Sequence, residues 1–161
     1  MNQSITPFLA WLGTWGGSGE AQDSQAVRIR CTFETVVADT ALRMAFEATD
    51  LTGQTLYHGV VACLGPTPTG QLRAVALSTI HGNLLLEQTP DDEGVMALAG
   101  IAGNGNHIMV TFVPEGPDRL LFSAMWRPPE AAPDDPRLGR MTANLGKLTP
   151  MRMPPPDQRQ Q

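Results

Sequence analysis

The sequence has little of what marks several specialised classes of protein. Only two cysteines, Cys31 and Cys63, are present among 161 residues, which is too few for a disulfide framework or a structural zinc site. Both lie in apolar segments, so we expect reduced packing residues. No apolar run approaches the roughly 18 residues that span a bilayer, and the N-terminus lacks the basic start of a signal peptide. These absences predict a cytoplasmic protein with no membrane partner.

Basic residues are scarce and scattered. The chain has 11 lysines and arginines against 16 acidic residues, for a net charge of −5. A nucleic-acid-binding surface needs a concentrated basic patch, so we do not expect nucleic acid as a partner. The chain also lacks a Gly-X-Ser-X-Gly elbow and a Walker loop, and its histidines do not have the spacing of a metal site. We expect no metal, and no motif assigns a catalytic residue.

Short alternating segments follow one another along the chain. From 26 to 37, Val27, Ile29 and Phe33 alternate with polar residues, which is the period of a half-buried strand. No segment predicts a helix longer than two turns, and glycine-, proline- and asparagine-rich turns separate the segments. The predicted strands cover residues 13–19, 26–37, 42–49, 55–64, 72–80, 84–89, 95–102, 107–113, 119–127 and 138–149.

This number of hairpin-linked strands favours a closed barrel. An open sheet of that size would leave two exposed edges, whereas an even number of antiparallel strands lets the first strand meet the last. The interior of such a barrel is wider than side chains alone fill. We predict an all-β, up-and-down antiparallel barrel of about ten strands, preceded by a short helical turn at residues 7–12. Residues 1–149 are expected to form this single domain, and residues 150–161 a disordered, proline-rich tail.

A family resemblance begins at Gly-Thr-Trp-Gly-Gly-Ser-Gly, residues 13–19. This segment resembles the opening strand of the nitrobindin-like branch of the calycins, the superfamily of lipocalin and fatty-acid-binding-protein barrels, and the order of elements extends the resemblance over residues 7–149. It implies that Trp15 plugs one end of the barrel, with Lys147 or Arg140 of the last strand packed across its ring. The glycines that would let the opening strand bend where the barrel closes are Gly13, Gly17 and Gly19.

The same resemblance bears on haem. Nitrobindins bind haem through a histidine near the start of their last strand, but the histidines of this chain are His58, His81 and His107. None of them lies late enough in the chain to supply that ligand. We therefore expect no cofactor, and haem held through an atypical ligand is the alternative.

The candidate ligand-binding residues come from strands that would line the barrel. His58 can project into a cavity as a lone polar group among apolar walls, the usual pattern of a small-molecule site, or it can be a core histidine bonded to a neighbouring strand. His81 is expected in a solvated turn. Both faces of residues 55–64 are apolar, so the sequence leaves their orientation open. The cavity candidates are His58, Met44, Phe46, Met109 and Trp126.

The predicted function is the binding of a small hydrophobic molecule, driven by burial of apolar surface. One alternative is a cofactor-free barrel isomerase or cyclase that uses an inward histidine or carboxylate, and a second is a haem-binding protein with atypical ligation. Glu34, Glu47 and Glu87 fall in the solvent-facing phase of their strands, which favours a non-catalytic role. The resemblance leaves a homodimer open.

Overall fold

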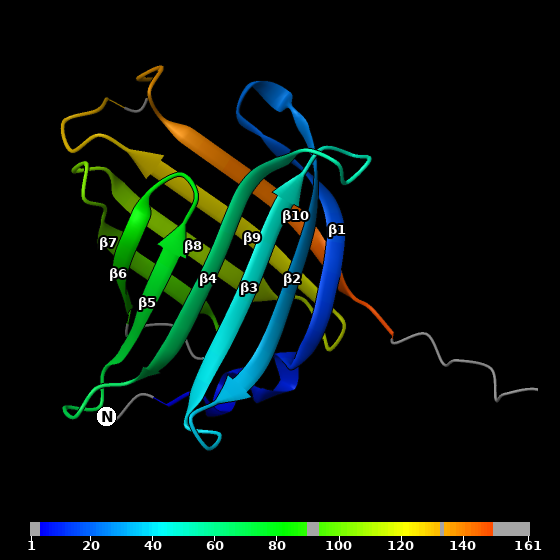
Figure 1. Cartoon of the computed structure of the whole chain (residues 1–161), viewed down its shortest axis with the longest axis vertical. Coiled ribbons are helices and arrows are strands. Elements are labelled where there is room, and N and C mark those ends of the chain that lie inside the picture. Colours follow the sequence, from blue (N-terminus) through cyan, green and yellow to red (C-terminus); the bar gives the residue numbers. More distant parts are fainter. Residues whose placement is uncertain (1–3, 90–93, 133, 150–161) are drawn as a thin grey trace, which may run out of the picture.

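The structure is a computed structural model that describes residues 4–89, 94–132 and 134–149. Within them, ten antiparallel strands form a closed barrel in which β1 pairs with β10, as Figure 1 shows. The predicted all-β barrel is confirmed, while the tail predicted for residues 150–161 lies outside the described residues. The elements are η1 (Thr6–Trp11), β1 (Gly13–Ala21), η2 (Gln22–Ser24), β2 (Ala26–Val36), β3 (Ala41–Thr49), β4 (Leu56–Pro66), β5 (Leu72–Ser78), β6 (Gly82–Gln88), β7 (Met96–Ile101), β8 (His107–Pro114), β9 (Arg119–Arg127) and β10 (Gly139–Lys147).

Two glycines of β1 allow the barrel to close. A Cβ at Gly17 would lie 2.0 Å from the carbonyl oxygen of Asn144, and a Cβ at Gly19 would lie 2.1 Å from that of Thr142. No side chain fits at such distances. Glycine at these two positions therefore lets the backbone of β10 approach β1 closely.

The end of the barrel near η1 is closed and filled with aromatic rings. In Figure 1, η1 (dark blue) lies across the lower end of the barrel. The indole Nε1 of the fully buried Trp15 donates a hydrogen bond to the carbonyl of Trp11 at 2.8 Å, and Lys147 Nζ lies 5.6 Å from the centroid of the Trp15 ring. Phe33 and Phe112 pack edge to face, with centroids 5.5 Å apart. This half of the interior is solid.

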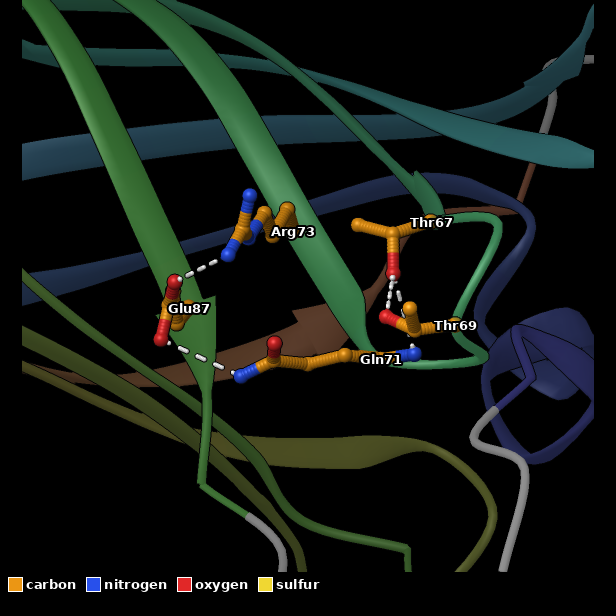
Figure 2. Close-up of polar contacts among 5 residues, drawn as sticks. All are labelled: Thr67, Thr69, Gln71, Arg73 and Glu87. Carbon is orange, nitrogen blue, oxygen red and sulfur yellow. Dashed lines mark hydrogen bonds and ion pairs between the residues drawn. The ribbon is translucent and has the colours of Figure 1, made fainter.

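Polar contacts on the outer face hold β5 in register with its neighbours (Figure 2). Arg73 and Glu87 are cross-strand partners joined by an ion pair of 2.9 Å, and Gln71 Nε2 donates to Glu87 at 3.1 Å. In the β4–β5 turn, Thr67 Oγ1 accepts the backbone N–H of Gln71 and bonds to Thr69. Exposed pairs of this kind contribute about 1 kcal/mol or less, but this register sends alternate β5 residues into the barrel.

The β5–β6 hairpin turns earlier than the sequence predicts. Ser78 Oγ accepts hydrogen bonds from the backbone N–H groups of Ile80 at 3.2 Å and His81 at 3.1 Å, which ends β5 at Ser78. Gly82, with φ +69°, then starts β6. The prediction of a solvated turn at His81 is wrong, because this tight reversal leaves the His81 side chain only 8% exposed.

Substitution of the closure glycines tests their role. Gly17→Ala and Gly19→Ala should each lower the free energy of unfolding by at least about 2 kcal/mol, because the new methyl group must push β10 away. Urea denaturation gives the measurement. The control is Gly103→Ala, where a Cβ would meet nothing within 4 Å, with an expected change within about 0.5 kcal/mol. Equal effects at Gly17, Gly19 and Gly103 would contradict this account of closure.

Candidate functional site

The half of the barrel away from η1 encloses a cavity of about 50 Å³. Its walls include Phe46, Leu84 and Phe122, with His58 and His81 beside them. A space of that size holds a few water molecules or a few ligand atoms, whereas pockets for drug-sized ligands measure roughly 300–1,000 Å³. A ligand larger than a few atoms therefore requires side chains of the wall to move.

Larger hollows lie on the outside of the barrel. One of about 720 Å³ is lined by Arg28, Arg30 and Glu47. These side chains point outward from β2 and β3, since the adjacent residues Ile29 and Phe46 are buried in the interior. These residues are polar and solvated. The internal cavity is the stronger candidate, since it combines apolar walls with buried polar atoms.

The structure brings four of the five predicted cavity residues to the internal cavity. The prediction for Met109 is wrong, because its side chain is 52% exposed on the outside of β8. The alternation of β8 instead directs Ile108 and Val110 inward. Because Met109 and both of its neighbours are apolar, the sequence does not show which of them faces the interior. The four predicted residues that the structure places in the cavity wall are Met44, Phe46, His58 and Trp126.

The orientation of β4, left open by the sequence, is set by its pairing with β3. His58 and Ala62 are buried and line the cavity, whereas Tyr57 and Val61 are 37% and 40% exposed. A register shift in the β3–β4 pairing lies between Ala48 and Thr49. Beyond that irregularity, His58 lies opposite Ala48 and faces the interior.

Three polar groups meet at the end of the cavity away from η1. His58 Nε2 lies 2.8 Å from Ser78 Oγ, the oxygen that also accepts two backbone N–H groups of the β5–β6 turn. The ring centroids of His58 and His81 are 5.8 Å apart. Strands β4 and β5 and the β5–β6 turn therefore place these groups together, although the sequence predicts an inward role for His58 alone.

His81 is the buried polar group that is left unpaired. Both of its ring nitrogens are buried and have no hydrogen-bond partner among the described residues. An unpaired buried donor or acceptor costs about 1–3 kcal/mol, and such a group in a native structure marks strain or a partner such as water or a ligand. The ring of His81 thus keeps a donor and an acceptor that no described residue pairs.

Trp126 of β9 is part of the cavity wall. It is half-buried, and its ring centroid lies 5.3 Å from that of His81 and 6.1 Å from that of His58. The indole lies against Gly139 of β10, where a Cβ would be 2.0 Å from the ring. A glycine on β10 therefore provides the space for this ring, a relation between two strands that the sequence does not show.

Burial governs the protonation of both histidines. It lowers the pKa of His58 to about 4, with a smaller contribution from the nearby His81, and it lowers the pKa of His81. No charged side chain is among the described residues that line the cavity. Both imidazoles are therefore neutral at pH 7.

The interior does not fit a haem site of the kind that the resemblance implies. Strand β10 carries no histidine, and the two inward histidines lie beside Trp126 in a space of about 50 Å³, far too small for a porphyrin. Across the described part of the chain, no three His, Cys, Asp or Glu side chains are grouped so as to hold a metal ion. Likewise, no described helix is long and apolar enough to span a membrane.

Comparison with known proteins identifies the fold and no family. No protein-family model matches the chain, and no curated protein matches it. Among solved structures, Rv2717c from M. tuberculosis is similar with a TM-score of 0.68, 16% identity, and coverage of 90% of this chain and 97% of that one. The S-type phycobiliprotein lyase CPES from Guillardia theta has a TM-score of 0.58 and 12% identity, covering 91% and 94%. EF1p2_mFAP2b bound to DFHBI has a TM-score of 0.51 and 9% identity, covering 91% and 100%. At these identities the likeness shows the barrel fold alone.

The buried histidines predict a loss of stability in mild acid. Their pKa values lie below the roughly 6.5 of an unfolded histidine, so the unfolded chain binds more protons. The stability held by neutral His58 is complete above about pH 6.5 and is lost as the pH falls toward its folded pKa of about 4. Urea unfolding should show a decrease of about 2 kcal/mol between pH 7 and pH 5.

A variant without a titratable group at position 58 distinguishes the contribution of His58 to the pH dependence of stability from that of the carboxylates. His58→Gln keeps a neutral polar side chain, and its free energy of unfolding should change much less between pH 7 and pH 5, above the range in which ordinary carboxylates titrate. The exposed His107 provides the control, since His107→Gln should retain the decrease seen in the unmodified protein. A decrease of the same size in His58→Gln would refute the assignment.

Proposed function

We propose that this protein binds a small, largely apolar molecule inside the barrel, at the end of the cavity formed by His58, His81 and Trp126. The observation that carries this proposal is His81, a residue of the cavity wall whose two buried ring nitrogens have no hydrogen-bond partner among the described residues. Apolar walls contribute affinity, at about 25 cal/mol per Å² of buried surface. The unpaired nitrogens contribute orientation.

Flexible parts of the wall supply room for a ligand. Met44 lines the cavity and is unbranched, so it changes conformation at low cost. Trp126 is half-buried in the cavity wall, so we expect rotation of its indole toward solvent to enlarge the cavity. Movement of these two side chains reconciles the enclosed volume of about 50 Å³ with a ligand of more than a few atoms.

The pKa values favour binding over acid–base catalysis. A general acid or base works best when its pKa lies near the operating pH, whereas burial holds the pKa of His58 at about 4. At neutral pH such a group is a weak base and is almost never protonated. The strand carboxylates that the sequence places in the solvent-facing phase do not line the cavity: Glu34 and Glu47 are exposed, and the half-buried Glu87 pairs with Arg73.

Two fold neighbours support a role in binding. One of them, EF1p2_mFAP2b, is bound to DFHBI, and another is a phycobiliprotein lyase. Each aligns with 91% of this chain, and the complex with DFHBI is an example of a similar architecture that holds a small molecule. Their ligands do not identify the molecule bound by this chain.

Filling the cavity tests the proposal. Native mass spectrometry of protein purified without added ligand should show a bound small molecule, or binding should appear after incubation with a mixture of small apolar compounds. Ala76→Leu places three extra carbons in the cavity wall and should reduce the bound fraction at least about tenfold, equivalent to about 1.4 kcal/mol. The control is Ala45→Leu, at the half-buried β3 position between Met44 and Phe46. Unchanged binding in Ala76→Leu would place the ligand elsewhere.

A further inference from the structure

We infer that the cavity selects an uncharged ligand that presents a hydrogen-bond acceptor, such as a carbonyl oxygen, to His58 and His81. This inference rests on the proposed function and names the chemical class of the ligand. The supporting observation is the set of hydrogen bonds to Ser78, which determines the nitrogen of His58 that bears the proton.

Ser78 has one hydrogen to donate and two lone pairs with which to accept. Its Oγ accepts the backbone N–H of Ile80 at 3.2 Å and that of His81 at 3.1 Å. Both lone pairs are then occupied. The contact of 2.8 Å with His58 Nε2 must therefore be a hydrogen bond that the hydroxyl donates, with Nε2 as the acceptor.

This assignment determines the tautomer of His58. A neutral imidazole has one protonated and one unprotonated nitrogen, so Nδ1 carries the hydrogen when Nε2 accepts. No acceptor among the described residues bonds to His58 Nδ1. His58 therefore presents a free N–H donor, fixed in place through Ser78 and the β5–β6 turn.

His81 adds a second donor and one acceptor. Its neutral ring contributes one N–H and one lone pair, neither of which is paired among the described residues. The two rings are 5.8 Å apart between centroids and together offer two donors against one acceptor. A ligand group that accepts hydrogen bonds suits this excess, whereas a hydrocarbon leaves all three groups unpaired.

The remaining lining excludes a net charge. No carboxylate, lysine or arginine is among the described residues that line the cavity, and a buried charge without a partner is costly. Phe46 and Phe122 pack with centroids 4.9 Å apart and offer apolar surface to the rest of the ligand. The depressed pKa of His58 agrees with this picture, since burial also disfavours the imidazolium that would pair with an anion.

The first test observes the tautomer directly. A long-range ¹H–¹⁵N correlation spectrum of the full-length protein at pH 7 distinguishes protonated from unprotonated ring nitrogens. His58 should show a protonated Nδ1, and Ser78→Ala should remove this preference while Ser123→Ala, on β9, leaves it unchanged. A protonated Nε2 in the unmodified protein would overturn the inference.

The second test compares ligands of one shape. Cyclopentanone, methylenecyclopentane, cyclopentanecarboxylate and cyclopentylammonium share a five-membered ring and differ in the group attached to it. Binding is followed through chemical-shift changes of residues in the cavity wall. Cyclopentanone should bind roughly threefold to tenfold more tightly than methylenecyclopentane, as expected for one net hydrogen bond, and the two ions should bind more weakly than cyclopentanone.

Variants test whether the histidines cause the preference for cyclopentanone. They also distinguish failure of this inference from failure of the proposed function. The ratio of cyclopentanone to methylenecyclopentane affinity should fall toward one in His58→Leu/His81→Leu and, with both imidazoles retained, in Ser78→Ala. If both neutral compounds bind equally, or an ion binds best, the inference is wrong while the proposed function stands. If no compound of the series binds, the proposed function fails and the inference fails with it.

Discussion

Close contact between the backbones of β1 and β10 is the constraint on which the rest of the structure depends. Gly17 and Gly19 leave no side chain between these strands, so the ladder of hydrogen bonds continues around the barrel and no edge remains open. Closure also assigns every strand an inner and an outer phase. An enclosed interior, and with it any buried site, exists only because the first and last strands meet.

The interior is divided by side-chain size. Near η1, Phe33 and Phe112 fill the space together with the indole rings of the N-terminal segment. Toward the other end, the wall includes Ala62, Ala76 and Ala124, and these short side chains leave a void that neighbouring rings do not reach. One half of the barrel thus supplies a packed core, while the other half encloses a cavity of about 50 Å³.

The polar end of that space explains why binding is the function that the structure supports best. An apolar core without histidines would be more stable, because His81 is buried without partners among the described residues. The hydroxyl of Ser78 connects the backbone turn to His58, so the hairpin fixes the position of the His58 ring. Preorganisation of this kind lowers the entropy lost on binding.

The sequence by itself determined the all-β class, the approximate number of strands and the inward phase of Met44 and Phe46, because alternation with a period of two is a local property of each strand. The inward direction of His58 was left open, since both faces of its strand are apolar, and it was decided by the pairing of β4 with β3. It did not determine the burial of His81, the outward direction of Met109 or the space that Gly139 leaves for an indole ring. The burial of His81 depends on where the β5–β6 turn reverses the chain, and the direction of Met109 depends on which apolar face of β8 points inward. The space for the indole ring depends on the residue of β10 that lies opposite Trp126. Only the register of the closed barrel brings residues distant in the sequence close enough to decide them.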